Sequence, residues 1–145
     1  MSPRITAARH VPGPDIRGET VAEMIGGGVQ TIIGAHRDPT FGPAVMFGLG
    51  GIYTEVLNDT VLHCAPVDRV TALDMIRAIK AFPILDGARG QPKVDLDALA
   101  DAIAAVSRIM TTQGWKVESV EINPFIALPQ GGVGVDALIH VKADH

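Results

Sequence analysis

Three oxygen-bearing side chains near the C-terminus have the types and spacing of a divalent-metal site. Glu121 and Asn123 are two residues apart in VESVEINPF, and the alternation of a strand places both side chains on one face. The PQGG segment predicts a hairpin turn that brings Asp136 on the returning strand beside them. Two carboxylates and an amide suit Mg²⁺, with water and phosphate oxygens completing the octahedron. Solvated polar positions on an exposed strand would show the same pattern.

A glycine-rich segment, FGLGGIYTE, has the composition of an anion-binding loop. Its glycines at 48, 50 and 51 would let backbone N–H groups approach a phosphate closely. The segment has neither the lysine and Ser/Thr of a Walker loop nor a third glycine at dinucleotide-binding spacing. An anion-binding loop and a tight structural turn therefore both stay open.

The elements that must position these residues follow from the hydrophobic pattern. Residues 20–25 and 29–37 predict two strands joined by a glycine turn, and the apolar run 44–47 predicts a strand buried on both faces. The segments on either side of PQGG predict the two arms of the C-terminal hairpin.

Two helices are predicted between these groups of strands. Asp68 and Thr71 are candidate N-caps of the first, and the second begins near Asp95 and ends near Gly114. Apolar residues at three- and four-residue intervals give the second helix one buried face. The intervening FPILDGARGQP predicts an irregular loop. The order of strands, two helices and strands predicts an α+β fold with a largely antiparallel sheet and two flanking helices.

Composition limits the classes of function. The 145 residues fit one domain, and a formal net charge of −4 argues against broad attraction to nucleic acid or anionic membranes. No apolar stretch approaches the roughly 20 residues that cross a bilayer. The single cysteine, Cys64, excludes an internal disulfide and is expected to be a small buried side chain. We expect a soluble, cytoplasmic protein.

Four motifs occur in order along the chain: RDPTFGP, GLGGIYTE, ARG and EINP. Together they resemble the ADP-forming acyl-CoA synthetases, including the acetyl-CoA synthetase β subunit, and the likeness covers nearly all of residues 20–141. EINP followed by a later aspartate is also similar to the succinyl-CoA synthetase β subunit. The resemblance implies the C-terminal subdomain of an ATP-grasp domain over residues 20–145, after a connector or irregular segment at 1–19.

The resemblance also implies roles for individual residues. In that family the positions matching Glu121, Asn123 and Asp136 surround the Mg²⁺ that is bound to the phosphates of ATP or ADP. The implied nucleotide-binding residues lie in two segments, beside the adenine pocket and at the phosphoryl-transfer site: Glu23, Met24 and Ile25, then Gly48, Gly50, Gly51 and Glu55. Arg89 in the ARG motif would meet a phosphate, a partner surface or only solvent.

The implied chemistry is reversible: acyl-CoA, ADP and phosphate give the free acid, CoA and ATP. We expect the isolated chain to need partners, namely the N-terminal ATP-grasp lobe and the CoA-binding domains or subunit, and a homo-oligomer is possible. Residues 1–19 do not match that lobe, Gln30 stands where the family usually has glutamate, and no histidine matches the family's phosphohistidine. The first hypothesis is therefore a split or partial acid–CoA ligase that is inactive alone. The alternative is a non-catalytic remnant or partner-binding domain of the same fold.

Overall fold

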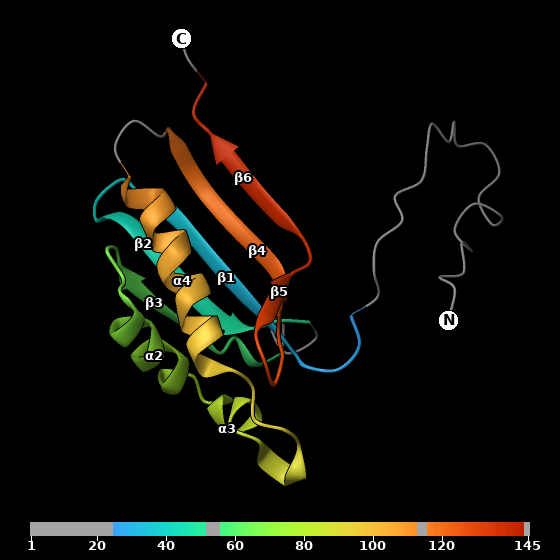
Figure 1. The fold of residues 1–145 in the computed structure, drawn as a ribbon. Coiled ribbons are helices and arrows are strands. Elements are labelled where there is room, and N and C mark those ends of the chain that lie inside the picture. Colours follow the sequence, from blue (N-terminus) through green and yellow to red (C-terminus); the bar gives the residue numbers. More distant parts are fainter. Residues whose placement is uncertain (1–24, 52–55, 113–115, 144–145) are drawn as a thin grey trace, which may run out of the picture.

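Six strands form one antiparallel sheet in the structure, a computed structural model that describes residues 25–51, 56–112 and 116–143 (Figure 1). The strands lie in the order β3, β2, β1, β4, and both β5 and β6 pair with β4. Their bounds are β1 Val29–Asp38, β2 Gly42–Leu49, β3 Thr60–Cys64, β4 Val117–Ala127, β5 Gly132–Gly134 and β6 Ala137–Val141. The predicted α+β fold with a largely antiparallel sheet is confirmed.

Two helices pack on the same face of this sheet (Figure 1). α2 spans Arg69–Ala78 and α4 spans Leu96–Thr111. Asp68 caps α2 by accepting the Thr71 N–H at 2.7 Å, and Asp95 caps α4 by accepting the Ala98 N–H at 3.0 Å. Both predicted helix starts are confirmed. Gly114, the predicted end of the second helix, lies outside the described residues.

The core lies between these helices and the sheet. α4 contributes a stripe of side chains at helical spacing that are at most 2% exposed: Leu99, Ile103, Val106 and Met110. From the sheet, Ile33, Val45 and Phe47 are fully buried against them. The side chains that alternate with these, such as half-buried Met46, lie on the opposite face. The expectation that 44–47 is buried on both faces is therefore wrong, because the helices cover only one face.

Two further features differ from the sequence prediction. The segment predicted as an irregular loop contains a short helix, α3 Phe82–Leu85, and a 3-10 turn, η2 Ala88–Gly90. Pro83 falls in the first turn of α3, where a missing N–H costs nothing. Cys64 is exposed rather than buried, because it lies at the end of the edge strand β3.

The C-terminal hairpin has one more strand than the sequence predicted. The returning arm of the C-terminal hairpin is two strands, β5 and β6, with a break at Val135 and Asp136. The strand predicted over 20–25 lies outside the described residues except for Ile25, so it stays a prediction. No helix in the described part of the chain is long and apolar enough to cross a membrane.

Loss of a core side chain tests this architecture. Leu99 is fully buried, so Leu99→Ala should lower the free energy of unfolding by about 2–5 kcal/mol. Urea denaturation followed by circular dichroism measures this. Val70, which is 67% exposed on α2, provides the matched control, and Val70→Ala should change stability by less than about 0.5 kcal/mol. Equal losses for the two variants would contradict the packing of α4 on the sheet.

Candidate functional site

The three predicted metal ligands lie together. Glu121 and Asn123 are exposed on β4, on the face opposite the buried Val120. Asp136 is also exposed and lies at the break between β5 and β6. With Leu138 these residues line a hollow of about 170 Å³, which we call the carboxylate hollow. The predicted convergence of the three side chains is confirmed.

A bulge in the sheet shapes the carboxylate hollow. β1 pairs Thr31 with Phe125 but Ile33 with Ile122, so Asn123 and Pro124 both stand opposite Ile32. The displaced backbone bonds to the break between β5 and β6 instead: the Asn123 N–H donates to the Asp136 carbonyl at 3.0 Å. Asn123 and Asp136 are therefore held side by side by their main chains, whatever their side chains bind.

The side chains of the carboxylate hollow are chemically suited to a hard cation. The Asn123 Nδ2 donates to Glu121 Oε1 at 3.2 Å, which leaves the amide oxygen available as a ligand. Within the described segments, no basic side chain pairs with the carboxylate of Glu121 or Asp136. Two neighbouring carboxylates without a cation repel each other. Mg²⁺ takes few protein oxygens and keeps water or phosphate oxygens, so these residues fit it.

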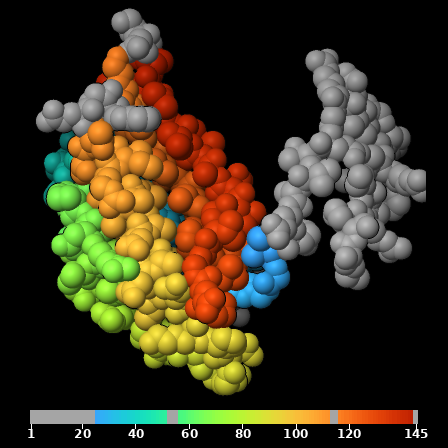
Figure 2. Space-filling view, viewed as in Figure 1, coloured from blue at the N-terminus to red at the C-terminus, as the bar shows by residue number. Residues whose placement is uncertain are grey.

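A second, larger space lies at the end of the sheet where β1 begins and β2 ends. We call it the glycine cleft; it measures about 880 Å³, and its walls include Gly28, Gln30, Gly50, Gly51, Arg89 and Pro129. Figure 2 shows residues 82–94, in yellow, next to the orange-red turn that follows β4. Four residues that the sequence singled out separately, namely Gln30, Gly50, Gly51 and Arg89, thus meet in one cleft.

The two spaces are distinct. Gln30 is paired with Ile126, which is three residues beyond Asn123 on β4, or about 10 Å along a strand.

Gly48, a predicted nucleotide-binding residue, lines neither the glycine cleft nor the carboxylate hollow. It is buried in β2, where an added Cβ would lie 2.8 Å from Thr60 Cγ2 and 2.9 Å from the Asp59 carbonyl. The close approach of Thr60 and Asp59 therefore leaves no room for a side chain at this position.

Of the remaining predicted nucleotide-binding residues, Ile25 is the one that the structure describes. Ile25 is half-buried and lines neither the glycine cleft nor the carboxylate hollow. Glu23, Met24 and Glu55 lie outside the described residues, so their roles stay predictions.

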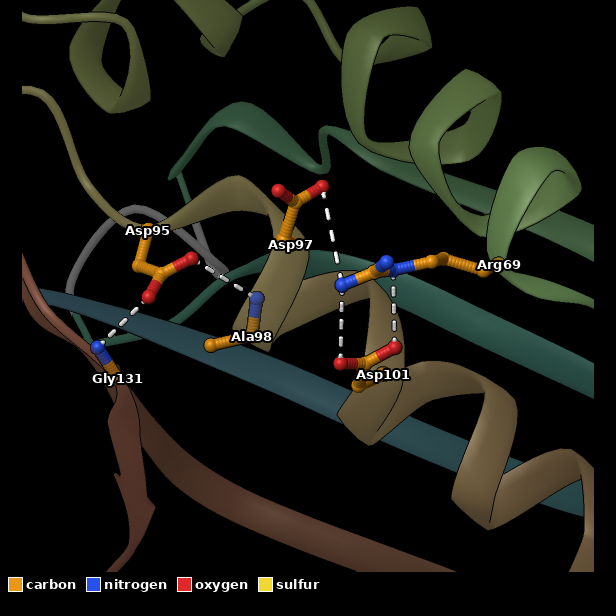
Figure 3. Close-up of polar contacts among 6 residues, drawn as sticks. All are labelled: Arg69, Asp95, Asp97, Ala98, Asp101 and Gly131. Carbon is orange, nitrogen blue, oxygen red and sulfur yellow. Dashed lines mark hydrogen bonds and ion pairs between the residues drawn. The ribbon is translucent and has the colours of Figure 1, made fainter.

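Asp95, which the sequence marked only as the start of the second helix, joins α4 to the turn between β4 and β5 (Figure 3). Its Oδ2 accepts the Gly131 N–H at 2.9 Å, and its own N–H donates to the Leu128 carbonyl at 2.7 Å. The Gly131 N–H, followed by the Ala98 N–H, holds the pKa of the Asp95 carboxyl below its usual value. The turn between β4 and β5 is therefore anchored to the start of α4. Asp95 and Gly131 are 36 residues apart in the chain, so no local pattern in the sequence indicates this contact.

Figure 3 also shows Arg69 of α2 reaching two carboxylates of α4. Its Nε lies 3.0 Å from Asp101 Oδ1, and its Nη2 lies 4.0 Å from Asp97 Oδ1. All three side chains are more than half exposed, so water screens these pairs and they add little to stability. They are peripheral to both spaces.

The comparisons with known proteins decide the family. A sequence profile described as the ATP-grasp domain matches residues 4–141. The chain belongs to the ATP-grasp family. It is 44% identical over 131 residues to the acetate–CoA ligase [ADP-forming] I subunit beta of Pyrococcus furiosus, covering 90% of this chain and 56% of that protein. The predicted relationship to ADP-forming acyl-CoA synthetases is confirmed.

Two further relatives of this ATP-grasp chain show the same kinship. The acetate–CoA ligase [ADP-forming] I of Archaeoglobus fulgidus is 40% identical over 87% of this chain, which corresponds to 18% of that longer protein. A solved structure of the acetyl-coenzyme A synthetase 1 of Ca. Korarchaeum cryptofilum, in complex with coenzyme A and Mg-AMPPCP, superposes with a TM-score of 0.76 at 41% identity. It covers 81% of this chain and 55% of that one. The chain thus spans about half the length of the β subunit and of the solved chain.

The lowered pKa of Asp95 makes a prediction about acid stability. The carboxylate's stabilisation is fully present above the unfolded value of 3.8 and is lost as pH falls through the lower folded pKa. Asp95→Asn keeps a capping side chain but has no charge to lose. The difference in Tm between the wild type and this variant should therefore shrink as the pH is lowered from about 6 to about 3, measured by thermal circular dichroism.

Asp97→Asn is the matched control for this measurement. Asp97 is the second residue after Asp95, is exposed, and has a single distant ion pair with Arg69. A Tm difference for Asp95→Asn that changes with pH no more than that of Asp97→Asn would contradict the role given to the Gly131 bond.

Proposed function

We propose that this chain supplies the Mg²⁺- and nucleotide-binding half of an ADP-forming acyl-CoA synthetase. The reaction would be acyl-CoA + ADP + phosphate ⇌ acid + CoA + ATP. The observation that carries the proposal is the carboxylate hollow, where two carboxylates and an amide share the sheet face that the helices leave uncovered. Support for the nucleotide comes from the Mg-AMPPCP complex of a protein that is 41% identical.

Each ligand of the hollow would have a separate task. Mg²⁺, when bound, would neutralise phosphate charge during phosphoryl transfer. Glu121 and Asp136 would hold the ion by charge, and the Asn123 amide oxygen would be a third, neutral ligand. The main-chain bond from Asn123 to Asp136 keeps two of the three ligands in place before the ion arrives, which lowers the ordering cost of binding.

The proposed partners follow from the length of the relatives. The β subunit and the solved chain extend well beyond the region matched here, so an N-terminal ATP-grasp lobe and CoA-binding domains are the proposed partners. The uncovered sheet face would meet that lobe across the nucleotide. The boundary at residues 19 and 20 and the cytoplasmic location stay predictions, as does a possible homo-oligomer.

One observation favours the alternative, a non-catalytic remnant of the same fold. Gln30 lines the glycine cleft at a position where the resemblance implies glutamate, which removes one negative charge from this wall. The carboxylate hollow nevertheless keeps all three of its oxygen ligands, so the nucleotide-binding proposal is favoured.

Paramagnetic NMR of the full chain tests the proposal without the other lobe. Mn²⁺ accepts the same oxygen ligands as Mg²⁺ and broadens nearby amide resonances. With Mn²⁺ and ADP added, we expect broadening at Glu121, Asn123 and Asp136. Asp136→Ala should weaken metal binding at least about tenfold, so the broadening should disappear at the same Mn²⁺ concentration.

The control is Asp74→Asn, which removes an exposed carboxylate on α2 that lies 4.0 Å from Arg77. This variant should keep the broadening at the hollow. If Asp136→Ala leaves the pattern unchanged, or if the broadening is centred on the acidic surface of α4 at Asp97 and Asp101, the proposed function is wrong.

A further inference from the structure

Arg89 gives the glycine cleft a charge that nothing in the described part of the chain neutralises. It is the single charged residue among the described residues that line the cleft, and it is exposed. No hydrogen bond or ion pair joins its guanidinium to another described residue. The neighbouring Lys93 and Asp86 pair with each other at 3.2 Å. In a chain of net charge −4, a cleft with one cation and no carboxylate among its described lining residues favours an anion.

The backbone holds Arg89 in a conformation that its own side chain disfavours. Arg89 has φ 56° and ψ 37° and stands between two glycines that also have positive φ, Gly87 at 88° and Gly90 at 74°. A left-handed conformation is costly for a residue that has a Cβ, and glycine or asparagine would fit it better. Such costs are often found at ligand-binding positions. The loop's own stability therefore does not account for an arginine here.

The loop that carries Arg89 is fixed at both ends. The Val94 N–H donates to the Leu85 carbonyl at 3.0 Å, and both side chains are at most 4% exposed. The Asp95 bond to Gly131 then joins this loop to the turn that carries Pro129, on another wall of the cleft. The guanidinium thus projects from an anchored loop.

The rest of the cleft is lined by glycine backbone, two neutral amide side chains and apolar residues. At Gly51, with φ 67°, an added Cβ would lie 3.1 Å from the Gln30 Oε1, so the backbone and this amide are already close. Gln30 and Gln91 offer amide N–H donors, and Ile84 and Val94 provide apolar walls. A planar guanidinium can bind two oxygens of one phosphate at once. The volume of about 880 Å³ is within the range of small-ligand sites.

We propose that Arg89 makes the glycine cleft a second anion site, which binds inorganic phosphate or a phosphoryl group apart from the carboxylate hollow. The choice of phosphate among anions rests on the proposed function, because that reaction uses phosphate in addition to the nucleotide. The separation of about 10 Å along β4 between Asn123 and Ile126 places the site beyond direct contact with an ion in the hollow.

Titration of the full chain with inorganic phosphate, followed by amide NMR at constant ionic strength, tests the site. We expect saturable shifts at Gln30, Gly51, Arg89 and Gly90. Arg89→Asn keeps a residue that accepts the left-handed conformation and should weaken phosphate binding at least about tenfold. Arg89→Lys keeps the charge without the two-pronged geometry and should bind with intermediate affinity. Lys93→Gln removes a cation of the same loop that does not line the cleft, and it should bind as the wild type does.

Acetate tests whether the site prefers phosphate to a carboxylate. Mn²⁺-ADP tests whether the site is separate from the nucleotide site. Acetate at the same concentration should give weaker shifts; equal shifts would mean a carboxylate site and overturn the choice of phosphate. The proposal is also overturned if phosphate shifts the wild type and Arg89→Asn equally, or if the wild type shows no shift. If Arg89→Asn abolishes the Mn²⁺-ADP broadening at Asp136, the cleft belongs to the nucleotide site and is not a second one.

These experiments distinguish failure of the proposed function from failure of the proposed phosphate site. Phosphate shifts that persist in Asp136→Ala, together with Mn²⁺-ADP broadening that persists in Arg89→Asn, support two independent sites. Failure of Mn²⁺-ADP to depend on Asp136 overturns the proposed function and leaves the phosphate titration unaffected.

Discussion

The register of β4 against β1 determines where both spaces lie. The bulge between the Thr31 and Ile33 pairings places one more residue on β4 than regular pairing would allow. On one side of it, Ile122 pairs with Ile33 on the helix-covered face and Glu121 points to the opposite face. On the other side, Ile126 pairs with Gln30 at the glycine cleft. A regular ladder would have changed the face presented by every residue beyond the bulge.

The bulge is itself held by a buried hydrogen bond. The Thr31 side chain is fully buried, and its Oγ1 donates to the Phe125 carbonyl at 2.8 Å. A buried hydroxyl without a partner would be costly, so this threonine and the irregular backbone satisfy each other. The hydrogen bond between Thr31 and Phe125 therefore stabilises the bulge that places Asn123 in the carboxylate hollow.

A second constraint joins the helices to the hairpin. Asp95 caps α4, bonds to the Leu128 carbonyl through its N–H and accepts the Gly131 N–H. One residue therefore fixes the start of the longest helix, the turn between β4 and β5, and the end of the Arg89 loop. The anchored turn carries Pro129, which lines the glycine cleft.

The sequence alone determined the local features. Alternation and turn residues predicted the hairpin that gathers Glu121, Asn123 and Asp136, and the capping aspartates predicted both helix starts, because these signals act between residues close in the chain. Only the tertiary structure decided that the returning arm breaks at Asp136, that β2 is covered on one face, and that Arg89 meets Gln30 and Gly51. Those outcomes depend on strand register and on packing between segments far apart in the sequence, and no local pattern encodes either one.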